Sequence, residues 1–470
     1  MTPEEFRTQG HRIIDWIADY RARVETFPVM ARTEPGDIKK QLPAAPPESP
    51  EPFDAIVADL DRIVTPGVTN WQHPRFFGYF PSSGALSSVL GDYVSTGLGV
   101  VGLAWQSSPA LTEVEEVMTD WLRQMLGLSE HWSGVINDTA STSTLVALMC
   151  ARERSSNYCL AGGGLQSEPQ ALVVYTSAHS HSSVEKAALL AGFGKSNVRV
   201  VPHDDANRMR PEWLEQMIQE DIANGRKPCA IVATTGTTTS TALDPLAAIG
   251  PVAKANGVWL HVDAAMAGSA MILPECRWMW EGVEHADSVI VNAHKWLGAV
   301  FDCTIYFVRD PEHLVRVMST NPSYLQTSAD GRVKNYRDWG LPLGRRFRAL
   351  KLWFLIREQG VAGLQARLRR DLDNAKWLEA QIANAPGWRV LAPVPLQTLC
   401  VRHEPRDVSG DALDRHTLEW AARLNQSGEA YLTPAMLDGR WMVRVSIGAE
   451  LTERVHVEQL WDLMQRSVAS

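Results

Sequence analysis

The chain is poor in cysteine, and its cysteines follow no ligand-like spacing. Six cysteines are spread over 470 residues, and no two of them form a CxxC pair. Widely separated cysteines of this kind are typical of thiols in a reducing compartment, and they argue against a structural zinc site. The sequence therefore predicts buried thiols, no bound metal and a cytoplasmic location.

Long apolar runs and an excess of basic residues are also lacking. No uninterrupted apolar run approaches the roughly 18 residues that a membrane-spanning helix needs. Residues 1–6 contain neither the basic nor the apolar segment of a secretory leader. The formal net charge of −9 disfavours a nucleic-acid partner. With 45% hydrophobic residues, the chain is expected to bury a large core. The short apolar runs and the negative charge together predict neither a membrane nor a nucleic-acid partner.

The middle of the chain has the pattern of an α/β protein. From residue 85 to about residue 310 short apolar strands alternate with helices, and we predict the strands at 171–177, 198–202, 229–234, 258–262, 288–292 and 304–308. Such alternation predicts a largely parallel sheet whose ligand lies at the carboxyl ends of the strands. No GxGxxG follows the first strand and no GxxxxGK occurs, which disfavours the alternative of an NAD-linked oxidoreductase on a Rossmann sheet.

The N-terminal segment, residues 1–84, is predicted to form a helical arm. Thr2 and Glu5 make a capping box before an amphipathic helix, and a proline-rich strap at 42–52 precedes a second helix near 53–64. Two helices and a strap cannot bury their own apolar faces. We therefore expect the arm to pack on a partner subunit.

Residues 85–350 are predicted to form the large domain, and residues 351–470 a small α+β domain. The small domain contains a long helix after Leu350, short strands and a final helix near Thr452. Residues 311–340 interrupt the alternation of strands and helices. The polar stretch 319–331 within them has no periodicity, which predicts a mobile lid.

Two strand ends carry residues that suggest chemistry. Lys295 follows one buried strand, and Asp263 ends another. A desolvated lysine has a lowered pKa, and its neutral amine can form a Schiff base with an aldehyde. Pyridoxal phosphate needs such a lysine and also a carboxylate for its ring nitrogen. Taken singly, the lysine could instead reach solvent and the aspartate could cap a helix.

Other polar positions fit the same ligand. The small polar run 139–143 stands directly before a helix, as a phosphate site requires, and 236–240 is a second small polar turn. His181 lies between a strand and a helix, where it could stack on a cofactor ring or remain a solvated loop residue. Tyr324, in the predicted lid, could act as an acid.

Together these segments resemble the group II pyridoxal-phosphate decarboxylases, and most closely the aromatic L-amino-acid decarboxylases. The resemblance covers nearly the whole chain and rests on residues 76–81, 178–185, 261–265, 292–296 and 343–347. It implies an α/β fold of the type I aminotransferase kind, with a mostly parallel seven-stranded sheet in the large domain, the helical arm and the small C-terminal α+β domain. It also implies a homodimer whose active sites are shared across the interface.

The resemblance also implies roles for individual residues. Lys295 would hold pyridoxal 5′-phosphate, Asp263 would bind its ring nitrogen and His181 would stack on its ring. The remaining cofactor-binding positions would be Thr139, Ala140, Ser141, Thr238, Asp244, Ala265, Asn292 and His294. The substrate-binding positions would be Tyr79, Phe80, Pro81, Ser82, Leu103, Trp105, His181 and Gly344. The catalytic set would be Lys295, His181, Asp263 and Tyr324, with Tyr324 entering the other subunit's site to protonate Cα.

The implied reaction is decarboxylation of an aromatic L-amino acid to an amine and CO2. Because Tyr324 and His181 are both present, decarboxylation is favoured over an aldehyde synthase activity, which adds oxidative deamination with O2. Gly344, where histidine-specific relatives carry Ser, favours a catechol or indole over histidine, the other alternative substrate. Ser82 could hydrogen-bond a ring hydroxyl, so DOPA is expected ahead of 5-hydroxytryptophan and tryptophan, although Leu103 and Met266 depart from many relatives and weaken that order.

Overall fold

The computed structural model describes residues 1–320, 323 and 327–469, and their contacts divide the chain into two compact units. The large unit comprises Ser82–Leu372 with Ala392–Thr398. The small unit comprises Met1–Pro81, Asp373–Leu391 and Leu399–Ser470, so the N-terminal arm groups with the C-terminal segment. The domain borders after residues 84 and 350 stay predictions, and helix α11 (Ala349–Asn384) contributes to both units.

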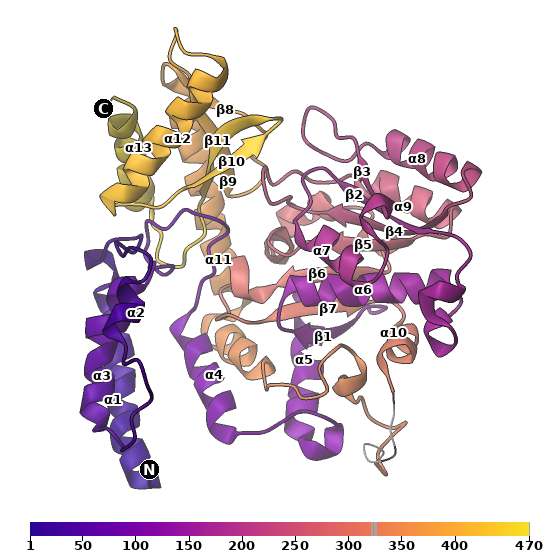
Figure 1. The fold of residues 1–470 in the computed structure, drawn as a ribbon, viewed down its shortest axis with the longest axis horizontal. Coiled ribbons are helices and arrows are strands. Elements are labelled where there is room, and N and C mark those ends of the chain that lie inside the picture. The colour runs from indigo at the N-terminus through magenta and orange to yellow at the C-terminus, as the bar shows by residue number, and fades with distance from the viewer. Residues whose placement is uncertain (321–322, 324–326, 470) are drawn as a thin grey trace. The chain divides into compact units, whose positions relative to one another are not determined.

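A seven-stranded sheet forms the centre of the large unit, as predicted (Figure 1). Its order is β1-β7-β6-β5-β4-β2-β3. Strand β7 runs antiparallel to both of its neighbours, while β6, β5, β4, β2 and β3 pair in parallel. The strands are β1 (Ser133–Asn137), β2 (Leu172–Ser177), β3 (Val198–Val201), β4 (Lys227–Thr234), β5 (Trp259–Asp263), β6 (Ser288–Asn292) and β7 (Thr304–Val308).

Helices cover both faces of this sheet, which explains why its central strands read as continuous apolar runs. On one face, α6 (Ala140–Ser155) and α7 (Ser183–Leu190) share a buried apolar cluster with β1, β2, β4, β5, β6 and β7, and α6 lies across these strands (Figure 1). On the other face, Tyr175 of β2 donates its hydroxyl hydrogen bond to Asp221 of α8 (Pro211–Ala223), at 2.9 Å. The sheet is therefore a rigid support for residues at its edge.

The other helices of the large unit are α4 (Leu86–Leu98), α5 (Pro109–Met125), α9 (Leu246–Ala255) and α10 (Pro311–Met318). Helix α10 lies within residues 311–340, where the sequence predicted no helix. Its start carries signals that were missed, because Pro311 occupies the first turn and the Asp310 side chain accepts a hydrogen bond from the His313 N–H at 2.9 Å. The predicted lid falls partly outside the described residues, and Tyr324 lies outside them.

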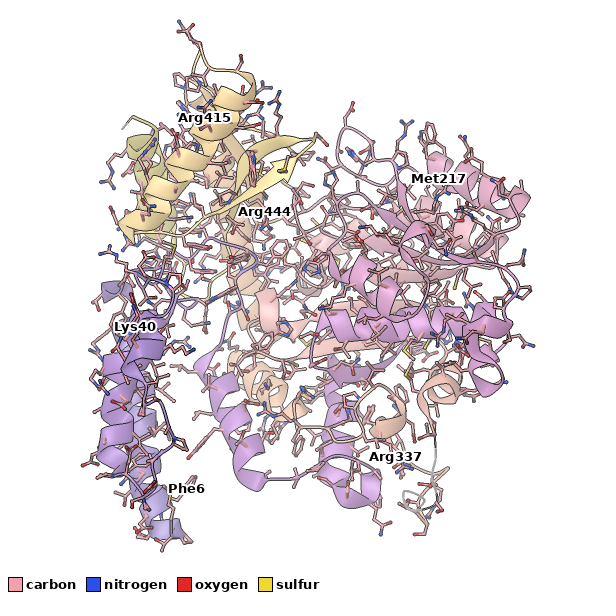
Figure 2. All side chains as sticks on the ribbon, in the orientation of Figure 1. Phe6, Lys40, Met217, Arg337, Arg415 and Arg444 are labelled. Atoms are coloured by element: carbon pink, nitrogen blue, oxygen red, sulfur yellow. The ribbon has the colours of Figure 1, made fainter. Side chains whose placement is uncertain are left out.

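The small unit combines the arm helices with a four-stranded sheet of order β10-β11-β9-β8. The predicted capping box of α1 is confirmed, since Thr2 and Glu5 exchange backbone-to-side-chain hydrogen bonds at 3.2 and 2.6 Å. No residue of α1 is buried, and Phe6, near its N-terminal end, is 51% exposed (Figure 2). The elements of the small unit are α1 (Pro3–Ala22), α2 (Asp37–Gln41), α3 (Phe53–Asp59), β8 (Trp388–Val390), β9 (Thr398–His403), α12 (Gly410–Ser427), β10 (Thr433–Leu437), β11 (Arg440–Ser446) and α13 (Arg454–Ala469).

The structure bears on two predictions from the sequence, one about the cysteines and one about membrane-spanning helices. All six cysteines lie in the described part of the chain, are buried and form no disulfide. Within the same described residues, no helix combines the length and the apolar character needed to cross a bilayer.

Candidate active site

The predicted site residues meet at one edge of the large sheet. Because β1, β2, β4, β5 and β6 all run in the same direction, their carboxyl ends lie together. Asp263 pairs in register with Thr234 of β4 and with Ile290 of β6. Beyond the strands, the backbone N–H of Asn292 donates to the Ala265 carbonyl at 2.9 Å. These bonds fix the segment that leads to Lys295 beside the end of β5.

Lys295 lies in a π-type turn, Ala293–Leu297, that directly follows β6. Its backbone angles, φ −96° and ψ −116°, are not helical, and Gly298 closes the turn with φ +99°. The Lys295 side chain is half-buried, while its neighbours His294 and Trp296 are buried. The lysine therefore projects from a turn whose other side chains are packed into the protein.

His181 is held near Lys295 and Asp263. The pKa of its imidazole is lowered by burial and further by the positive charge of Lys295, and the carboxylate of Asp263 opposes this shift. At the start of α7, the Ser183 N–H donates to His181 Nδ1 at 3.1 Å, so the neutral ring carries its proton on Nε2. The three residues predicted from three different strand ends thus act on one another.

Asp263 is a buried carboxylate at the end of β5. Its Oδ1 accepts a hydrogen bond from the Ala265 N–H at 3.0 Å. A buried carboxylate suits a cationic partner such as a protonated ring nitrogen. The segment after β5 packs closely on β6, because a Cβ added to Gly268 would come within 2.6 Å of the Val291 side chain.

The N-terminus of α6 has the features of a phosphate site. Thr139 caps this 16-residue helix by accepting from the Thr142 N–H at 3.5 Å. Thr139 and Ala140 are half-buried and Ser141 is exposed, so the first turn is open to solvent. Backbone N–H groups at a helix N-terminus, together with hydroxyls, bind phosphate well.

Asn292 and His294 complete this side of the site. Thr304 donates its hydroxyl to Asn292 Oδ1 at 2.8 Å, which leaves the amide N–H groups to face elsewhere. Burial, followed by the charge of Lys295, lowers the pKa of His294 to about 4, so its ring is neutral. The Cys303 N–H donates to His294 Nδ1 at 2.9 Å. Cys303 and Thr304 were missed in the sequence because they act only through these partners.

Asp244 and Thr238 sit near the end of β4. Asp244 is buried, and its two carboxylate oxygens accept backbone N–H groups from Met209 at 2.7 Å and from Thr234 at 2.8 Å. Burial raises the pKa of Asp244 to about 6. The carboxylate therefore braces the end of β4 in this structure, and Thr238 is half-buried in the turn that follows. Their direct contact with a cofactor ring stays a prediction.

The substrate-binding positions divide between the two units. In the large unit, Ser82 donates its hydroxyl to the carbonyl of His294 at 2.6 Å, and Trp105 donates its backbone N–H to Asn335 at 2.9 Å. Gly344 is exposed, and a Cβ added to it would lie 3.5 Å from Val101. Leu103, Tyr79, Phe80 and Pro81 complete the predicted set, and the last three belong to the small unit.

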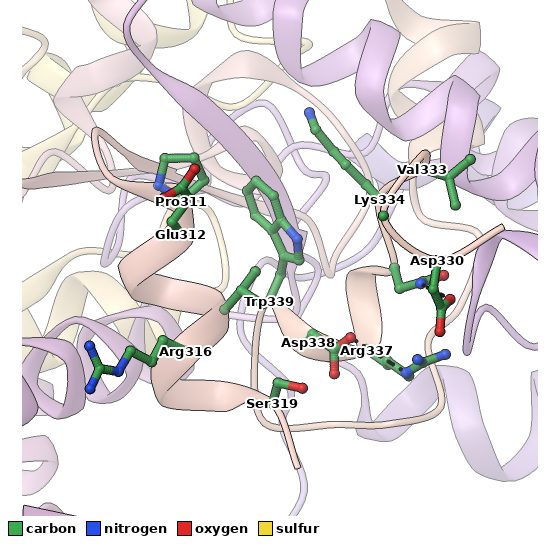
Figure 3. Close-up of a pocket in the computed structure, with 13 residues that line it drawn as sticks. Pro311, Glu312, Arg316, Ser319, Asp330, Val333, Lys334, Arg337, Asp338 and Trp339 are labelled. Carbon is green, nitrogen blue, oxygen red and sulfur yellow. Dashed lines mark hydrogen bonds and ion pairs between the residues drawn. The ribbon is translucent and has the colours of Figure 1, made fainter. Parts of the chain in front are cut away.

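A separate cavity of about 520 Å³ lies beside α10 and the segment after the predicted lid (Figure 3). Its lining includes Trp339, Lys334 and Arg337. Arg337 pairs with Asp338 at 3.5 Å, and Lys334 pairs with Glu116 at 3.7 Å. None of the described residues that line it belongs to the predicted site at the strand ends.

Comparison with known proteins identifies the family. The model described as "Pyridoxal-dependent decarboxylase conserved domain" matches residues 35–404. The chain belongs to the pyridoxal-dependent decarboxylase family. One relative of this decarboxylase is phenylacetaldehyde synthase of Arabidopsis thaliana, 39% identical over 479 residues that cover 100% of this chain and 97% of that protein. Another is tyrosine decarboxylase of Papaver somniferum, 40% identical over 489 residues, with coverage of 99% and 94%.

The decarboxylase also resembles solved structures over its full length. It aligns with the crystal structure of Oryza sativa TDC with PLP and tryptamine at a TM-score of 0.96 and 36% identity, covering 100% of this chain and 98% of that chain. The fold and the cofactor inferred from the sequence are thereby confirmed. Pyridoxal 5′-phosphate is the cofactor of this decarboxylase, and the donor set of Lys295, Asp263 and the α6 N-terminus fits its aldehyde, ring nitrogen and phosphate.

Proposed function

We propose that this decarboxylase converts an aromatic L-amino acid to the corresponding amine and CO2. The observation that carries the proposal is the meeting of Lys295, Asp263 and His181 at the carboxyl ends of β6, β5 and β2. The relatives, a tyrosine decarboxylase and a phenylacetaldehyde synthase, support an aromatic substrate. The closely matching structure, which contains tryptamine, supports an aromatic amine product.

In this proposal each residue has a defined task. Lys295 supplies the amine that holds the cofactor, and Asp263 stabilises the protonated ring nitrogen. The α6 N-terminus (Thr139, Ala140 and Ser141) and Asn292 bind the phosphate, neutral His294 lies beside the cofactor, and His181 stacks on the ring. Bound pyridoxal phosphate supplies an electron sink for the electrons of the broken Cα–carboxylate bond. Thr238, Asp244 and Ala265 shape the surroundings of the ring.

The preferred substrate is proposed to be DOPA, ahead of 5-hydroxytryptophan and tryptophan. Ser82 donates its hydroxyl to the His294 carbonyl at 2.6 Å, and a hydrogen bond between this serine and a ring hydroxyl of the substrate is part of the proposal. The space beside Gly344 suits a bicyclic or hydroxylated ring better than imidazole. Leu103, Trp105, Tyr79, Phe80 and Pro81 are proposed to shape the rest of the side-chain pocket.

The working enzyme is proposed to be a homodimer. Helix α4 buries its small residues Ser88, Gly91 and Ser95 within the large unit. Its opposite face exposes a row of large apolar side chains at helical spacing: Leu86, Leu90, Tyr93, Val94 and Leu98. An exposed apolar row of this length is typical of a subunit interface. A cytoplasmic location is also our proposal, supported by the six buried cysteines without a disulfide.

An aldehyde synthase activity is the competing function, because one relative carries that name. We propose that Tyr324 of the partner subunit protonates Cα and thereby prevents oxidation. In a Tyr324→Phe enzyme, aromatic aldehyde and hydrogen peroxide should rise by at least an order of magnitude relative to amine, since a positioned proton donor contributes roughly 10²–10⁴-fold. A Tyr324→Phe enzyme that makes amine alone would show that Tyr324 has no such role.

The test of the substrate is a competition assay. Enzyme saturated with pyridoxal phosphate is incubated with equimolar DOPA, 5-hydroxytryptophan, tryptophan, tyrosine, phenylalanine, histidine and glutamate, and amines are measured by mass spectrometry. Dopamine is expected to form first. A Ser82→Ala enzyme should lose preference for hydroxylated rings while keeping its rate on phenylalanine. Histamine or 4-aminobutyrate as the main product would reject an aromatic substrate.

A further inference from the structure

The turn that carries Lys295 needs support from outside itself. Its φ and ψ of −96° and −116° are not helical, so the turn is not a continuous helix at Lys295. Within the turn, the Gly298 N–H reaches the Lys295 carbonyl at a long 3.3 Å, and the Ala299 N–H reaches the Ala293 carbonyl at 3.0 Å. Local hydrogen bonds alone therefore hold the lysine weakly.

Helix α11 supplies the external support. Trp296, the residue after Lys295, is 1% exposed, and its indole N–H donates to Asp371 Oδ2 at 2.9 Å. One helical turn earlier, Arg367 donates to the carbonyl of Leu297. Positions 367 and 371 are four residues apart, so they lie on one face of α11 and hold two successive residues of the turn. All of these residues belong to the large unit.

Asp371 places a carboxylate in the interior of the protein, next to the turn that carries Lys295. Its side chain is fully buried, and a buried carboxylate is costly unless charged and hydrogen-bonding partners compensate it. Arg370 pairs with Asp371 Oδ1 at 3.4 Å, and the indole of Trp296 occupies the other oxygen. Burial raises the pKa of Asp371 to about 6.

A second segment holds the same turn from another direction. Ser82 donates to the His294 carbonyl at 2.6 Å, and the Ala85 N–H donates to the Gly298 carbonyl at 3.1 Å. The Val300 N–H donates to Ser88 Oγ at 2.9 Å. Carbonyls on both sides of Lys295 are thus fixed, and of the two side chains that flank it, His294 accepts from the Cys303 N–H and the Trp296 indole donates to Asp371.

We propose that Asp371 is a positioning residue that sets the direction of the Lys295 amine by holding the Trp296 indole. The inference rests on the proposed role of Lys295 as the cofactor-binding lysine. Without this contact the turn relaxes, and the amine meets the cofactor aldehyde out of line. A misplacement of about 1 Å costs roughly 10²-fold in reactions that depend on alignment. The loss should therefore fall on cofactor attachment and on kcat, with little effect on KM.

The test compares three variants with a matched control. Asp371→Leu removes the acceptor, Trp296→Phe removes the donor together with part of the buried ring, and Asp371→Asn keeps an oxygen that can accept from the indole. The control is Tyr175→Phe, which also removes one hydrogen bond to a buried aspartate, Asp221, in the same unit but at α8. The readouts are the rate at which apo-enzyme incorporates pyridoxal phosphate, the pH titration of the visible band of the bound cofactor, kcat and KM, and amide hydrogen exchange across residues 293–301.

Asp371→Leu and Trp296→Phe are expected to slow incorporation and kcat by roughly 10²-fold and to leave KM within a few-fold of the wild type. They should also shift the titration of the visible band and speed amide exchange across 293–301. Asp371→Asn should stay within a few-fold of the wild type in every readout. Tyr175→Phe should change none of them.

Two results would overturn the inference. Either Trp296→Phe matches Tyr175→Phe in all readouts, or Asp371→Asn fails as badly as Asp371→Leu. If Asp371→Leu does not fold, Trp296→Phe alone decides. Borohydride reduction of the wild type, followed by peptide mapping, separates this outcome from failure of the proposed function. If the reduced cofactor is found on Lys295 and the variants behave like the wild type, only the positioning role of Asp371 is rejected. If the reduced cofactor is found on another residue, the role of Lys295 itself is rejected.

Discussion

At the scale of single residues, the site depends on side chains placed where their charge is unusual. Lys295 is half-buried at a strand end, Asp263 is buried, and burial lowers the pKa of His294 to about 4. Residue type and position after an apolar strand were enough to suggest Lys295 and Asp263, whereas His294 entered the predicted site through the family resemblance. Their partners could not be predicted, because Trp296 and Asp371 are 75 positions apart and meet only in the folded chain.

Replacing the lysine tests the residue scale most simply. Lys295→Ala is expected to lower kcat by roughly 10³-fold or more, because it removes both the cofactor attachment and a group that acts as a unit with its neighbours. The kcat is measured as the rate of amine formation at saturating pyridoxal phosphate. Lys254→Ala, a change at the end of α9, serves as the control and should retain full activity. Normal turnover by Lys295→Ala would reject the assignment.

A buried histidine predicts a pH dependence of stability. Burial lowers the pKa of His261 to about 4, and its side chain is fully inaccessible in β5. Between pH 6.5 and 4 the unfolded chain binds a proton at this position and the folded chain does not, so the free energy of unfolding falls as the pH is lowered. At pH 4 this effect has lowered the free energy of unfolding by about 3 kcal/mol.

The measurement is urea unfolding of the wild type and of His261→Asn at several pH values. Below pH 6.5 the wild-type curve should fall more steeply than that of the variant, by up to about 1.4 kcal/mol per pH unit. Parallel curves would mean that His261 is already protonated in the folded protein.

At the scale of elements, the strands were predictable and some of their neighbours were not. Ser288–Asn292 and Thr304–Val308 match the predicted strands residue for residue, because alternation with helices and apolar runs mark central strands clearly. Strand β1 was missed, since Ser133-Gly134 weakens its signal and its place in the sheet depends on pairing with β7. Helix α10 was missed because its eight residues stand next to an aperiodic stretch.

Close packing between strand ends gives a prediction at this scale. Gly236, after β4, has φ +82°, and a Cβ there would come within 2.5 Å of the Ala267 Cβ. Gly236→Ala therefore meets both backbone strain and a collision beside the cofactor site, and it should cost about 2–4 kcal/mol. Gly225→Ala has a similar φ of +74° with no atom within 4 Å, so it should suffer only the backbone strain.

Thermal unfolding and pyridoxal phosphate affinity of the two glycine variants are the measurements. Gly236→Ala should have the lower midpoint and weaker cofactor binding. Equal effects of the two variants would show that the packing between the turn after β4 and the segment after β5 carries no special constraint.

At the scale of the whole molecule, we propose that the exposed face of α4 mediates self-association. Its buried side is made of small residues and its exposed side of large apolar ones, the reverse of a helix that faces water. The sequence predicted a dimer through the arm and through family resemblance. It could not identify this face, because only the fold shows which side of α4 is already covered.

Leu90→Asp is expected to shift the enzyme from dimer to monomer and to abolish most activity, since Tyr324 is proposed to act in the partner's site. Ile222→Asp on α8 is the matched control, because Leu90 and Ile222 are both 46% exposed. Sedimentation velocity at micromolar protein measures the change. A monomeric wild type, or a dimeric Leu90→Asp enzyme, would contradict the assignment of this face.

The most direct measurement of the central claim is the fate of the carboxylate in heavy water. Holoenzyme is incubated with DOPA in ²H₂O, and CO2, dopamine, aldehyde and hydrogen peroxide are measured together. The account predicts one CO2 for each dopamine, one deuterium at the carbon that lost its carboxylate, and no peroxide. Aldehyde formed with peroxide, or DOPA recovered unchanged, would contradict it.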